Sequence, residues 1–383
     1  MGSAEPLKKL ALERGRNSFW TMSRVTKTGS LTAGLPRLLA GAIAGAILLG
    51  GCSSGSTVDS PKFSTGKPTV ADDSAWASLV EAAKSEGEVV LYGPALPMDD
   101  VVSAFESDNP GISVRREIIP TPELISRVDQ EIAVGAQGAD VVLHSSDSWF
   151  KQSDEAGKLL SLHVSPDAAG HGWTERLQDK NFAGVYGFPY TLGYNTAGPG
   201  EIDSLPALLD KHPDARIGLV SPTAAPAIAN YYEVLRKTYG DGILDRLAKT
   251  KHTVVENNVP GMRSLIAGEF DYLVPSVYFD FVKPMSQGAP VSSKVPAKGA
   301  SGPRYSVASP SSAHHPAAAQ VFMNWMMGEQ GAKNLVKTLP PATVPLTTEG
   351  SIPWGDVATM NPDEWTKDKW DAWIKEQWVP RFG

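Results

Sequence analysis

The sequence predicts an α/β protein in which parallel strands alternate with helical crossovers. Short apolar runs alternate with segments of helical periodicity from Asp73 onward. Glycine or Asn-Pro-Gly ends several of the helical segments. The chain has 383 residues, 42% of them hydrophobic, which suffices for two lobes with packed cores. Strands connected in this way are covered by helices on both faces, and their crossovers are right-handed.

Residues 73–148 predict three helices, each followed by a strand. In the first helix, apolar residues from Trp76 to Ala83 recur at i, i+3, i+4 and i+7, and Gly87 ends the segment. Two further helices are predicted around 98–105 and over 122–134. Buried strands are predicted over 88–92, 112–117 and 139–144, and Ser145-Ser146-Asp147-Ser148 follows the last of them.

The alternation resumes after residues 186–194. Strands are predicted over 216–220, 252–255, 270–274 and 304–308, and helices over 224–239, 260–267, 278–286 and 316–327. Asn361-Pro362-Asp363-Glu364 then has the features of a helix start: a capping residue, a proline and two acids at the positive end of the dipole. We interpret Trp370, Trp373, Ile374 and Trp378 as a core-facing stripe of that helix.

The only cysteine lies in Leu49-Gly50-Gly51-Cys52, which resembles the lipobox of bacterial lipoproteins. A basic stretch precedes an apolar segment over 38–49, which is far shorter than the roughly 20 residues that span a bilayer. The pattern predicts a signal peptide over 1–51, begun at Met1 or Met22, and a flexible tether over 52–72. With Cys52 lipidated, we expect an extracytoplasmic protein anchored to the cell membrane.

The charge balance argues against a nucleic-acid partner. Of 35 basic and 42 acidic residues, residues 1–51 hold seven and two. The mature part keeps 28 against 40, a net charge of −12, which repels a phosphate backbone. Because the lipidated cysteine leaves no thiol for a disulfide, the fold must depend on a packed core.

Six short segments carry a family resemblance through their order and spacing. They are EGEVVLY at 86–92, GADVV at 138–142, EAGKLL at 155–160, YNT at 194–196, GEFD at 268–271 and HPAAA at 315–319. Across roughly residues 75–345 they resemble the periplasmic-binding-protein type 2 family, the substrate-binding components of ABC importers. The likeness is closest to the class of ferric-ion, thiamine, polyamine and phosphonate binders.

The resemblance implies two α/β lobes with hinge-linked parallel and mixed sheets, which close over a ligand in the cleft between them. It implies lobe 1 over 73–190, lobe 2 over 191–302, a return to lobe 1 over 303–345, and a Trp-rich C-terminal helix packed on lobe 2 over 346–383. It also implies an ABC permease and an ATPase as partners, a small-molecule solute as ligand, no cofactor, and a monomer.

Loops at the carboxyl ends of strands present free backbone N–H groups to a polar ligand. After the first strand, Tyr92 and Gly93 are expected to line the cleft, with Gly93 permitting a close backbone approach; an ordinary strand-end turn is the alternative. After the third strand, Ser145, Ser146 and Ser148 offer hydroxyls, and Trp149 follows them. Ordinary turn chemistry is the alternative explanation for the serines.

In lobe 2 the candidates follow two strands. Ser221 and Thr223 precede a predicted helix, where free N–H groups suit an anion; a plain N-cap is the alternative. Tyr278 occupies the region where ferric-ion binders of the family place two adjacent tyrosines. Here the second residue is Phe279, which cannot ligate iron.

Three classes of ligand stay open. The hydroxyls and N–H groups favour a small polar or anionic solute. Ferric iron needs several oxygen donors, so Tyr278 with Asp280 or Asp147 would require an added anion. Cationic amines are the third class, held by cation–π contacts with Tyr92, Trp149 and Tyr278.

Other groups are weaker candidates. Arg263 lies near the cleft or on a solvated helix face, and His314-His315, with no third ligand at a usable spacing, caps a helix or lies at the surface. The chain lacks the Gly-x-Ser-x-Gly, His-Glu-x-x-His and Gly-rich phosphate motifs, so we expect no enzyme. A sensor subunit on the same fold is the rival to transport.

Overall fold

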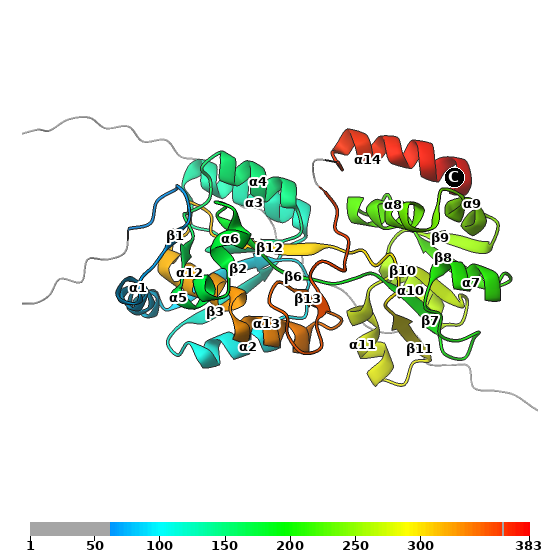
Figure 1. The fold of residues 1–383 in the computed structure, drawn as a ribbon, viewed down its shortest axis with the longest axis horizontal. Helices are drawn as coiled ribbons and strands as arrows, with labels where there is room; N and C mark the ends of the chain where they lie inside the picture. Colours follow the sequence, from blue (N-terminus) through cyan, green and yellow to red (C-terminus); the bar gives the residue numbers. More distant parts are fainter. Residues whose placement is uncertain (1–61, 362–363) are drawn as a thin grey trace, which may run out of the picture. The chain divides into compact units, whose positions relative to one another are not determined.

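Two large β-sheets, each carrying its own helices, organise the part of the chain that the computed structural model describes, residues 62–361 and 364–383 (Figure 1). The predicted signal peptide, Cys52 and the first part of the predicted tether lie outside these residues. The predicted two-lobe α/β fold is confirmed. No helix among the described residues combines the length and apolar character needed to cross a bilayer.

Lobe 1 is built on seven strands: β2 (Glu88–Gly93), β3 (Ser113–Ile118), β4 (Val141–His144), β6 (Phe182–Gly187), β12 (Arg304–Ala308), β13 (Thr343–Val344) and β14 (Ile352–Pro353). Their order is β14-β13-β6-β12-β4-β2-β3. β2 runs parallel to β3 and β4, whereas β12 runs antiparallel to β4 and β6.

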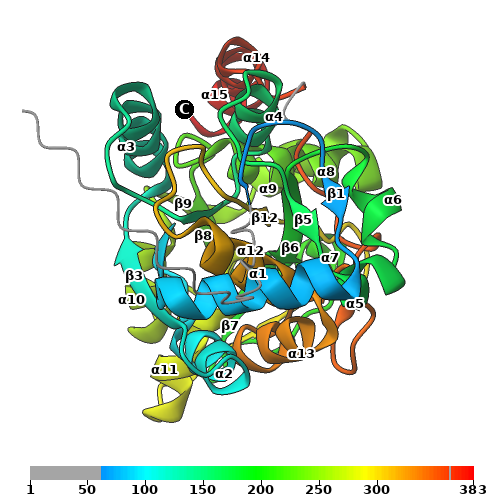
Figure 2. The ribbon, with the colours of Figure 1, turned by 90° about the vertical axis from the view of Figure 1, so that its left-hand side faces the viewer.

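Helices cover both faces of this sheet (Figure 2). One face packs against α1 (Asp73–Glu86), α2 (Asp99–Asp108), α12 (Pro316–Met327) and α13 (Glu329–Thr338), and the other against α3 (Thr121–Val134) and α4 (Asp147–Glu155). The short helices α5 (Pro166–Gly170) and α6 (Trp173–Leu177) complete the lobe.

Lobe 2 is built on five strands in the order β11-β7-β10-β8-β9. They are β7 (Thr191–Asn195), β8 (Arg216–Val220), β9 (Lys251–Val255), β10 (Tyr272–Ser276) and β11 (Val291–Lys294). The helices are α7 (Leu205–Lys211), α8 (Pro226–Tyr239), α9 (Gly242–Ala248), α10 (Asn258–Ile266) and α11 (Tyr278–Ser286), followed at the C-terminus by α14 (Lys367–Trp373), the π-helical turn η1 (Ile374–Trp378) and α15 (Val379–Phe382).

The predicted tether over 52–72 is wrong at its C-terminal end. Thr69 and Val70 form β1 (Thr69–Val70), which pairs in parallel with β5 (His163–Val164). The Phe63 ring also meets His163 edge-on, with ring centroids 5.5 Å apart. A polar, small-residue composition looks like a linker, but it does not reveal backbone pairing with a segment far along the chain.

The helix expected to have Asn361 as its N-cap begins five residues later, with Thr366 as its N-cap. The amides of Glu364 and Trp365 donate to the Asn361 carbonyl in a turn, and α14 starts at Lys367 with Thr366 as its N-cap. Trp365 is only 9% exposed, so the chain turns to bury it before the helix begins. Pro362 and Asp363 lie outside the described residues.

The C-terminal tryptophans pack on lobe 2. The Trp378 ring lies 4.8 Å from that of Tyr232 on α8, and Trp373 Nε1 donates to Glu233 Oε2 at 2.9 Å. Trp370 Nε1 donates to the carbonyl oxygen of Pro222 at 3.0 Å. The stripe therefore faces protein, as predicted, and one of its members holds the loop that follows β8.

Candidate functional site

A three-residue crossing, 188–190, fixes which edges of the two sheets face each other. β6 is parallel to β4 because both pair antiparallel with β12, so β6 leaves lobe 1 at the edge where β4 ends. β7 enters lobe 2 antiparallel to β10, at the edge where β10 ends. Three extended residues span only about 10 Å. The carboxyl ends of β2 and β4 therefore face those of β8 and β10.

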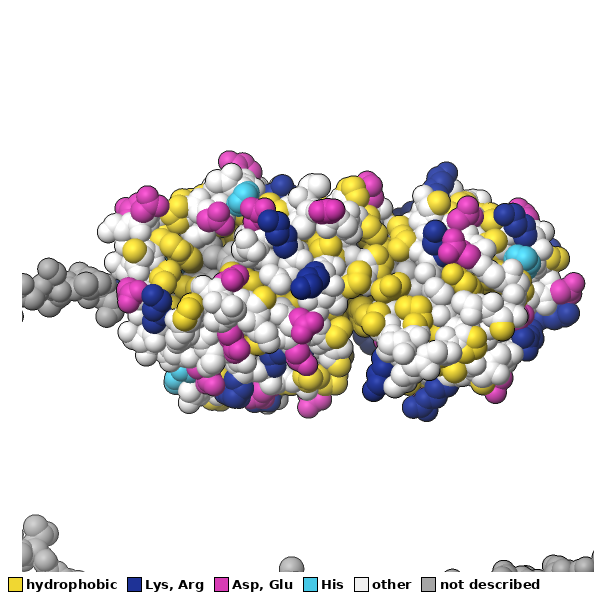
Figure 3. All heavy atoms as spheres, turned by 90° about the horizontal axis from the view of Figure 1, so that it is seen from below, with side chains coloured by type: hydrophobic (Ala, Val, Ile, Leu, Met, Phe, Trp, Pro, Cys, Tyr) yellow, Lys and Arg dark blue, Asp and Glu magenta, His cyan; other side chains and the backbone are white. Residues whose placement is uncertain are grey.

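Three chain segments form the hinge between these edges. The Tyr190 amide donates to the Ser301 carbonyl at 2.8 Å, and the Gly302 amide donates to the Ala358 carbonyl at 3.0 Å. The Phe188 ring meets Phe279 of lobe 2 with centroids 5.1 Å apart. Hydrophobic side chains also gather at the surface around the junction (Figure 3). Phe279, the neighbour of Tyr278 in the sequence, is thus a hinge contact.

At the lobe 1 edge, Gly93 and the serine loop lie together. A Cβ on Gly93 would lie 3.3 Å from the Leu143 carbonyl oxygen of the neighbouring strand, so glycine permits this approach. The hydroxyls of Ser146 and Ser148 are 3.3 Å apart, and Ser145 hydrogen-bonds Tyr305. Burial raises the pKa of Tyr305 to about 12, so its phenol stays protonated and available as a donor.

The buried His144 orders this loop. Its Nδ1 accepts from the Ser146 amide at 3.1 Å, and its ring stacks on Phe150 with centroids 4.2 Å apart. Burial lowers the pKa of His144 to about 3, so the imidazole is neutral at physiological pH. A neutral ring is what the bond requires, because Nδ1 accepts only when it carries no proton.

Tyr92 and Trp149 point away from the predicted cleft. The Tyr92 hydroxyl lies between Glu131 and Arg127 of α3, and the Trp149 Nε1 donates to Asp129 at 3.3 Å. Tyr92 is 1% and Trp149 7% exposed, and both belong to the core between the sheet and α3–α4. Since alternate residues of a strand face opposite sides, Tyr92 follows Val90 into that core. This geometry argues against their predicted role as ligand contacts.

At the lobe 2 edge, the predicted residues form two neighbouring loops. Ser221 and Thr223 bond each other through their hydroxyls at 2.7 Å, and the Thr223 amide donates to Ser221 Oγ at 3.2 Å. They precede α8, while Tyr278 begins α11 after the adjacent strand. The edge therefore offers hydroxyl groups beside two helix N-termini, an arrangement suited to a polar or anionic group.

Asp280 lies in the first turn of α11, and its carboxyl group has a raised pKa in the folded chain. Burial raises its pKa to about 6 from an ordinary 3.8. The folded chain thus binds this proton more tightly than the unfolded chain, and stability falls as pH rises between those two values. Asp280→Asn should be more stable than the native protein near pH 7 by about 1–3 kcal/mol. Urea unfolding of solute-free protein at several pH values measures this, and a difference that does not shrink below pH 4 would contradict it.

A separate cavity of 430 Å³ lies beside the crossing strands, and we call it the hinge cavity. Sequence reasoning missed it, because its central residues are Arg304 at the start of β12 and Trp354 beyond β14. The one available signal was Arg304, a charged residue next to a crossing. Its lining is Asp147, Lys151, Asp154, Glu155, Lys180, Phe182, Gly184, Arg304, Ser306, Trp354 and Asn361.

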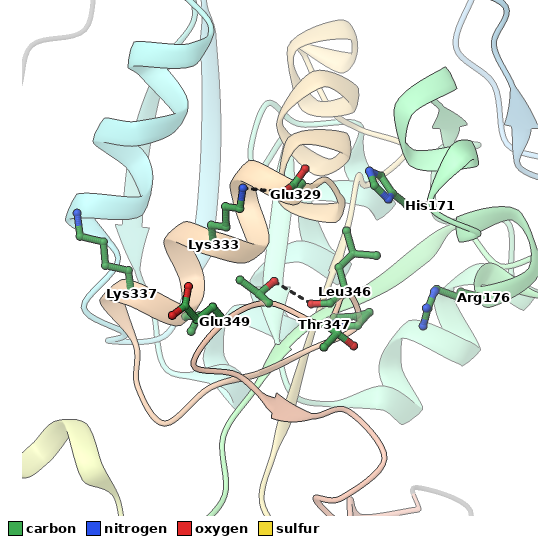
Figure 4. A pocket seen from close by; sticks show the side chains of 11 residues that line it. His171, Arg176, Glu329, Lys333, Lys337, Leu346, Thr347 and Glu349 are labelled. Carbon is green, nitrogen blue, oxygen red and sulfur yellow. Dashed lines mark hydrogen bonds and ion pairs between the residues drawn. The ribbon is translucent and has the colours of Figure 1, made fainter.

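A larger cavity of 740 Å³ lies elsewhere on lobe 1, between α13, the α5–α6 region and residues 345–349. Figure 4 shows His171, Arg176 and Thr347 on one side and Lys333 and Lys337 on the other. None of the predicted ligand residues lines it. Within residues 62–361 and 364–383, no group of three or more His, Cys, Asp or Glu side chains is placed to hold a metal ion.

The sequence matches the family model of bacterial extracellular solute-binding proteins over residues 89–338. Because this match covers more than half of the chain, the protein belongs to that family, and the resemblance seen in its sequence is confirmed. It is a solute-binding protein of the kind that serves ABC importers, and it is located outside the cytoplasm. A search of the curated proteins gives no match.

Solved structures share the fold. The substrate-binding protein of an ABC transporter from Agrobacterium tumefaciens aligns with a TM-score of 0.60 at 12% identity, covering 77% of this chain and 97% of that one. Iron-bound HitA from Pseudomonas aeruginosa aligns with a TM-score of 0.53 at 20% identity, covering 75% of this chain and 97% of that one. AfuA from Actinobacillus pleuropneumoniae, with fructose-6-phosphate bound, aligns with a TM-score of 0.53 at 17% identity, covering 77% of this chain and 98% of that one.

Proposed function

We propose that this protein captures a small polar or anionic solute between the facing edges of its two sheets and delivers it to an ABC permease and its ATPase. Gly93, Ser145, Ser146 and Ser148 supply the lobe 1 side, with Tyr305 behind them. Ser221, Thr223 and Tyr278 supply the lobe 2 side. Closure at the hinge then brings both sides onto the solute.

One observation carries this proposal: the crossing 188–190 joins the edge that ends in Ser145 to the edge that ends in Tyr278. Hydroxyl groups and helix N-termini converge there, and such groups suit a polar or anionic solute. Mass spectrometry of small molecules released from the purified protein by mild unfolding tests the class of solute. A polar or anionic compound is expected, and a neutral apolar compound would contradict the proposal.

Tyr278→Phe should weaken binding of the co-purified solute about tenfold, because a phenol that bonds a polar ligand contributes about 1.5 kcal/mol or more. Isothermal titration calorimetry measures the effect. Tyr239→Phe is the matched control, since that hydroxyl bonds the Lys298 carbonyl within lobe 2. Unchanged affinity in Tyr278→Phe would remove this residue from the site.

Ferric iron is the alternative ligand, suggested by the fold shared with an iron-bound protein. With Phe279 packed on Phe188, Tyr278 is left as one phenolate donor beside Asp280. We therefore expect no tyrosinate-to-iron absorbance band when ferric citrate is added. A band that disappears in Tyr278→Phe would establish the iron alternative.

We also propose that Cys52 anchors the mature chain to the membrane through its acyl groups. Cys52→Ala should move the protein from the membrane fraction to the soluble fraction of fractionated cells, because the acyl chains provide most of the attachment. An unchanged distribution would refute the anchor. We propose that the protein is a monomer. A sensor subunit is the alternative to a transport component. Genes for a permease and an ATPase beside the gene for this chain would favour transport.

A further inference from the structure

The hinge cavity is a half-open pocket lined by segments that lie far apart in the sequence. Its lining combines Phe182 and Gly184 of β6, Ser306 of β12, four residues of α4 and Trp354. Trp354 can lie on β6 because Gly184 has no side chain: a Cβ there would be 3.3 Å from the Trp354 ring. Trp354 lies beyond residue 338, where the family match ends.

Two opposite charges face each other in this cavity. The Arg304 guanidinium stacks over the Trp354 ring at 4.2 Å, and its Nη2 donates to the Trp354 carbonyl at 2.6 Å. Its Nε is buried without a hydrogen-bond partner among the described residues. On the other side, the Asp147 carboxylate accepts a hydrogen bond from Ser306. Among the described residues the two groups form no ion pair within 4 Å, although the Arg304 charge still lowers the pKa of Asp147 and the Asp147 charge raises that of Arg304.

Each of these charges has lost water without gaining a full partner. Burial raises the pKa of Asp147 and lowers the pKa of Arg304, so that each group is pushed toward its neutral form. A partly buried charge is costly unless an opposite charge or hydrogen bonds compensate it. A ligand with a positive end at Asp147 and a negative end at Arg304 compensates both at once.

The rest of the lining favours neither sign alone. The remaining charged residues of the lining are two acids, Asp154 and Glu155, and two bases, Lys151 and Lys180. Asp154 already accepts a hydrogen bond from Asn181, and the Lys180 ammonium lies over the Phe182 ring. A ligand with one net charge would therefore meet repulsion as well as attraction. A volume of 430 Å³ accommodates a short carbon skeleton between two charged ends.

We propose that the hinge cavity binds a small zwitterion, with its ammonium group against Asp147 and its carboxylate against Arg304 and the edge of Trp354. The site shares no residue with the solute-binding group proposed above. Because Trp354 belongs to the third segment that runs from lobe 1 to lobe 2, an occupied cavity would also tie α4 to that segment.

Calorimetry and thermal shift with glycine, β-alanine and 4-aminobutanoate test the proposal, with propylamine and propanoate as single-charge controls. At least one zwitterion should bind about tenfold more tightly than either control. Asp147→Asn and Arg304→Gln should each reduce that binding about tenfold or more. If a charge variant does not fold, Gly184→Ala, which pushes on Trp354, takes its place and should also weaken binding.

The outcomes separate this inference from the proposed function. Tyr278→Phe should leave zwitterion binding within about twofold of the native value. Zwitterion binding that persists in both charge variants, or is lost in Tyr278→Phe, would overturn the hinge site and leave solute capture between the edges intact. Absence of binding by all three zwitterions would overturn it as well.

Discussion

Replacing Asp140 by alanine should lower the free energy of unfolding by about 3–5 kcal/mol, the largest loss we expect from a single side chain. Asp140 is 0% exposed. One oxygen accepts from the His314 and His315 amides at 2.9 and 2.8 Å, and the other accepts from the Val90 amide and lies 2.8 Å from His315 Nδ1. It therefore ties β2 and β4 to the start of α12.

The change removes the acceptor of three backbone amides: the Val90 amide, whose bond is buried, and the His314 and His315 amides, whose bonds are partly buried. A buried donor left without a partner costs about 1–3 kcal/mol, and a partly buried donor costs less. Urea unfolding measures the loss. Asp140→Asn keeps one carbonyl oxygen and should fall between the alanine variant and the native protein. Asp100→Ala, an exposed acid on α2, is the control and should stay within about 0.5 kcal/mol. An equal effect of Asp140→Ala and Asp100→Ala would contradict the account of lobe 1.

Gly302→Ala should destabilise the hinge by about 2–3 kcal/mol and weaken solute binding with it. A Cβ at this position would lie 1.8 Å from the Phe188 carbonyl oxygen. Because the obstacle is backbone and not a flexible side-chain end, the two crossing strands must move apart. The movement would also strain the Tyr190 to Ser301 hydrogen bond, which sets the spacing of the facing edges.

Gly355→Ala is the matched control, since a Cβ there meets no atom within 4 Å. Thermal unfolding and calorimetry with the co-purified solute compare the two variants. A Gly302→Ala protein that melts and binds like Gly355→Ala would show that the crossing tolerates separation, and our account of the hinge would then be wrong.

Local patterns predicted much of this fold. The predicted strands over 216–220 and 304–308 and the predicted helices over 278–286 and 316–327 have those bounds in the structure. Each is determined by its own apolar spacing and by the residues that flank it. The positions of Ser145 and Tyr278 after strands could be predicted for the same reason.

Features that depend on distant partners could not be predicted in this way. The pairing of Thr69 with His163, the bonds of Asp140 to His314 and His315, and the stacking of Trp354 on Arg304 join segments far apart in the sequence. Tyr92 is a different case. Its strand position next to Val90 already indicated the α3 face, so strict use of the two-residue period would have placed it in the core.

Small-angle X-ray scattering of the mature chain, with and without the solute identified by mass spectrometry, tests the central claim most directly. If the facing edges close over the solute at the 188–190 hinge, the radius of gyration should fall on saturation, while Tyr278→Phe at the same solute concentration should change less. Identical scattering curves with and without a solute whose binding calorimetry has established would contradict the account.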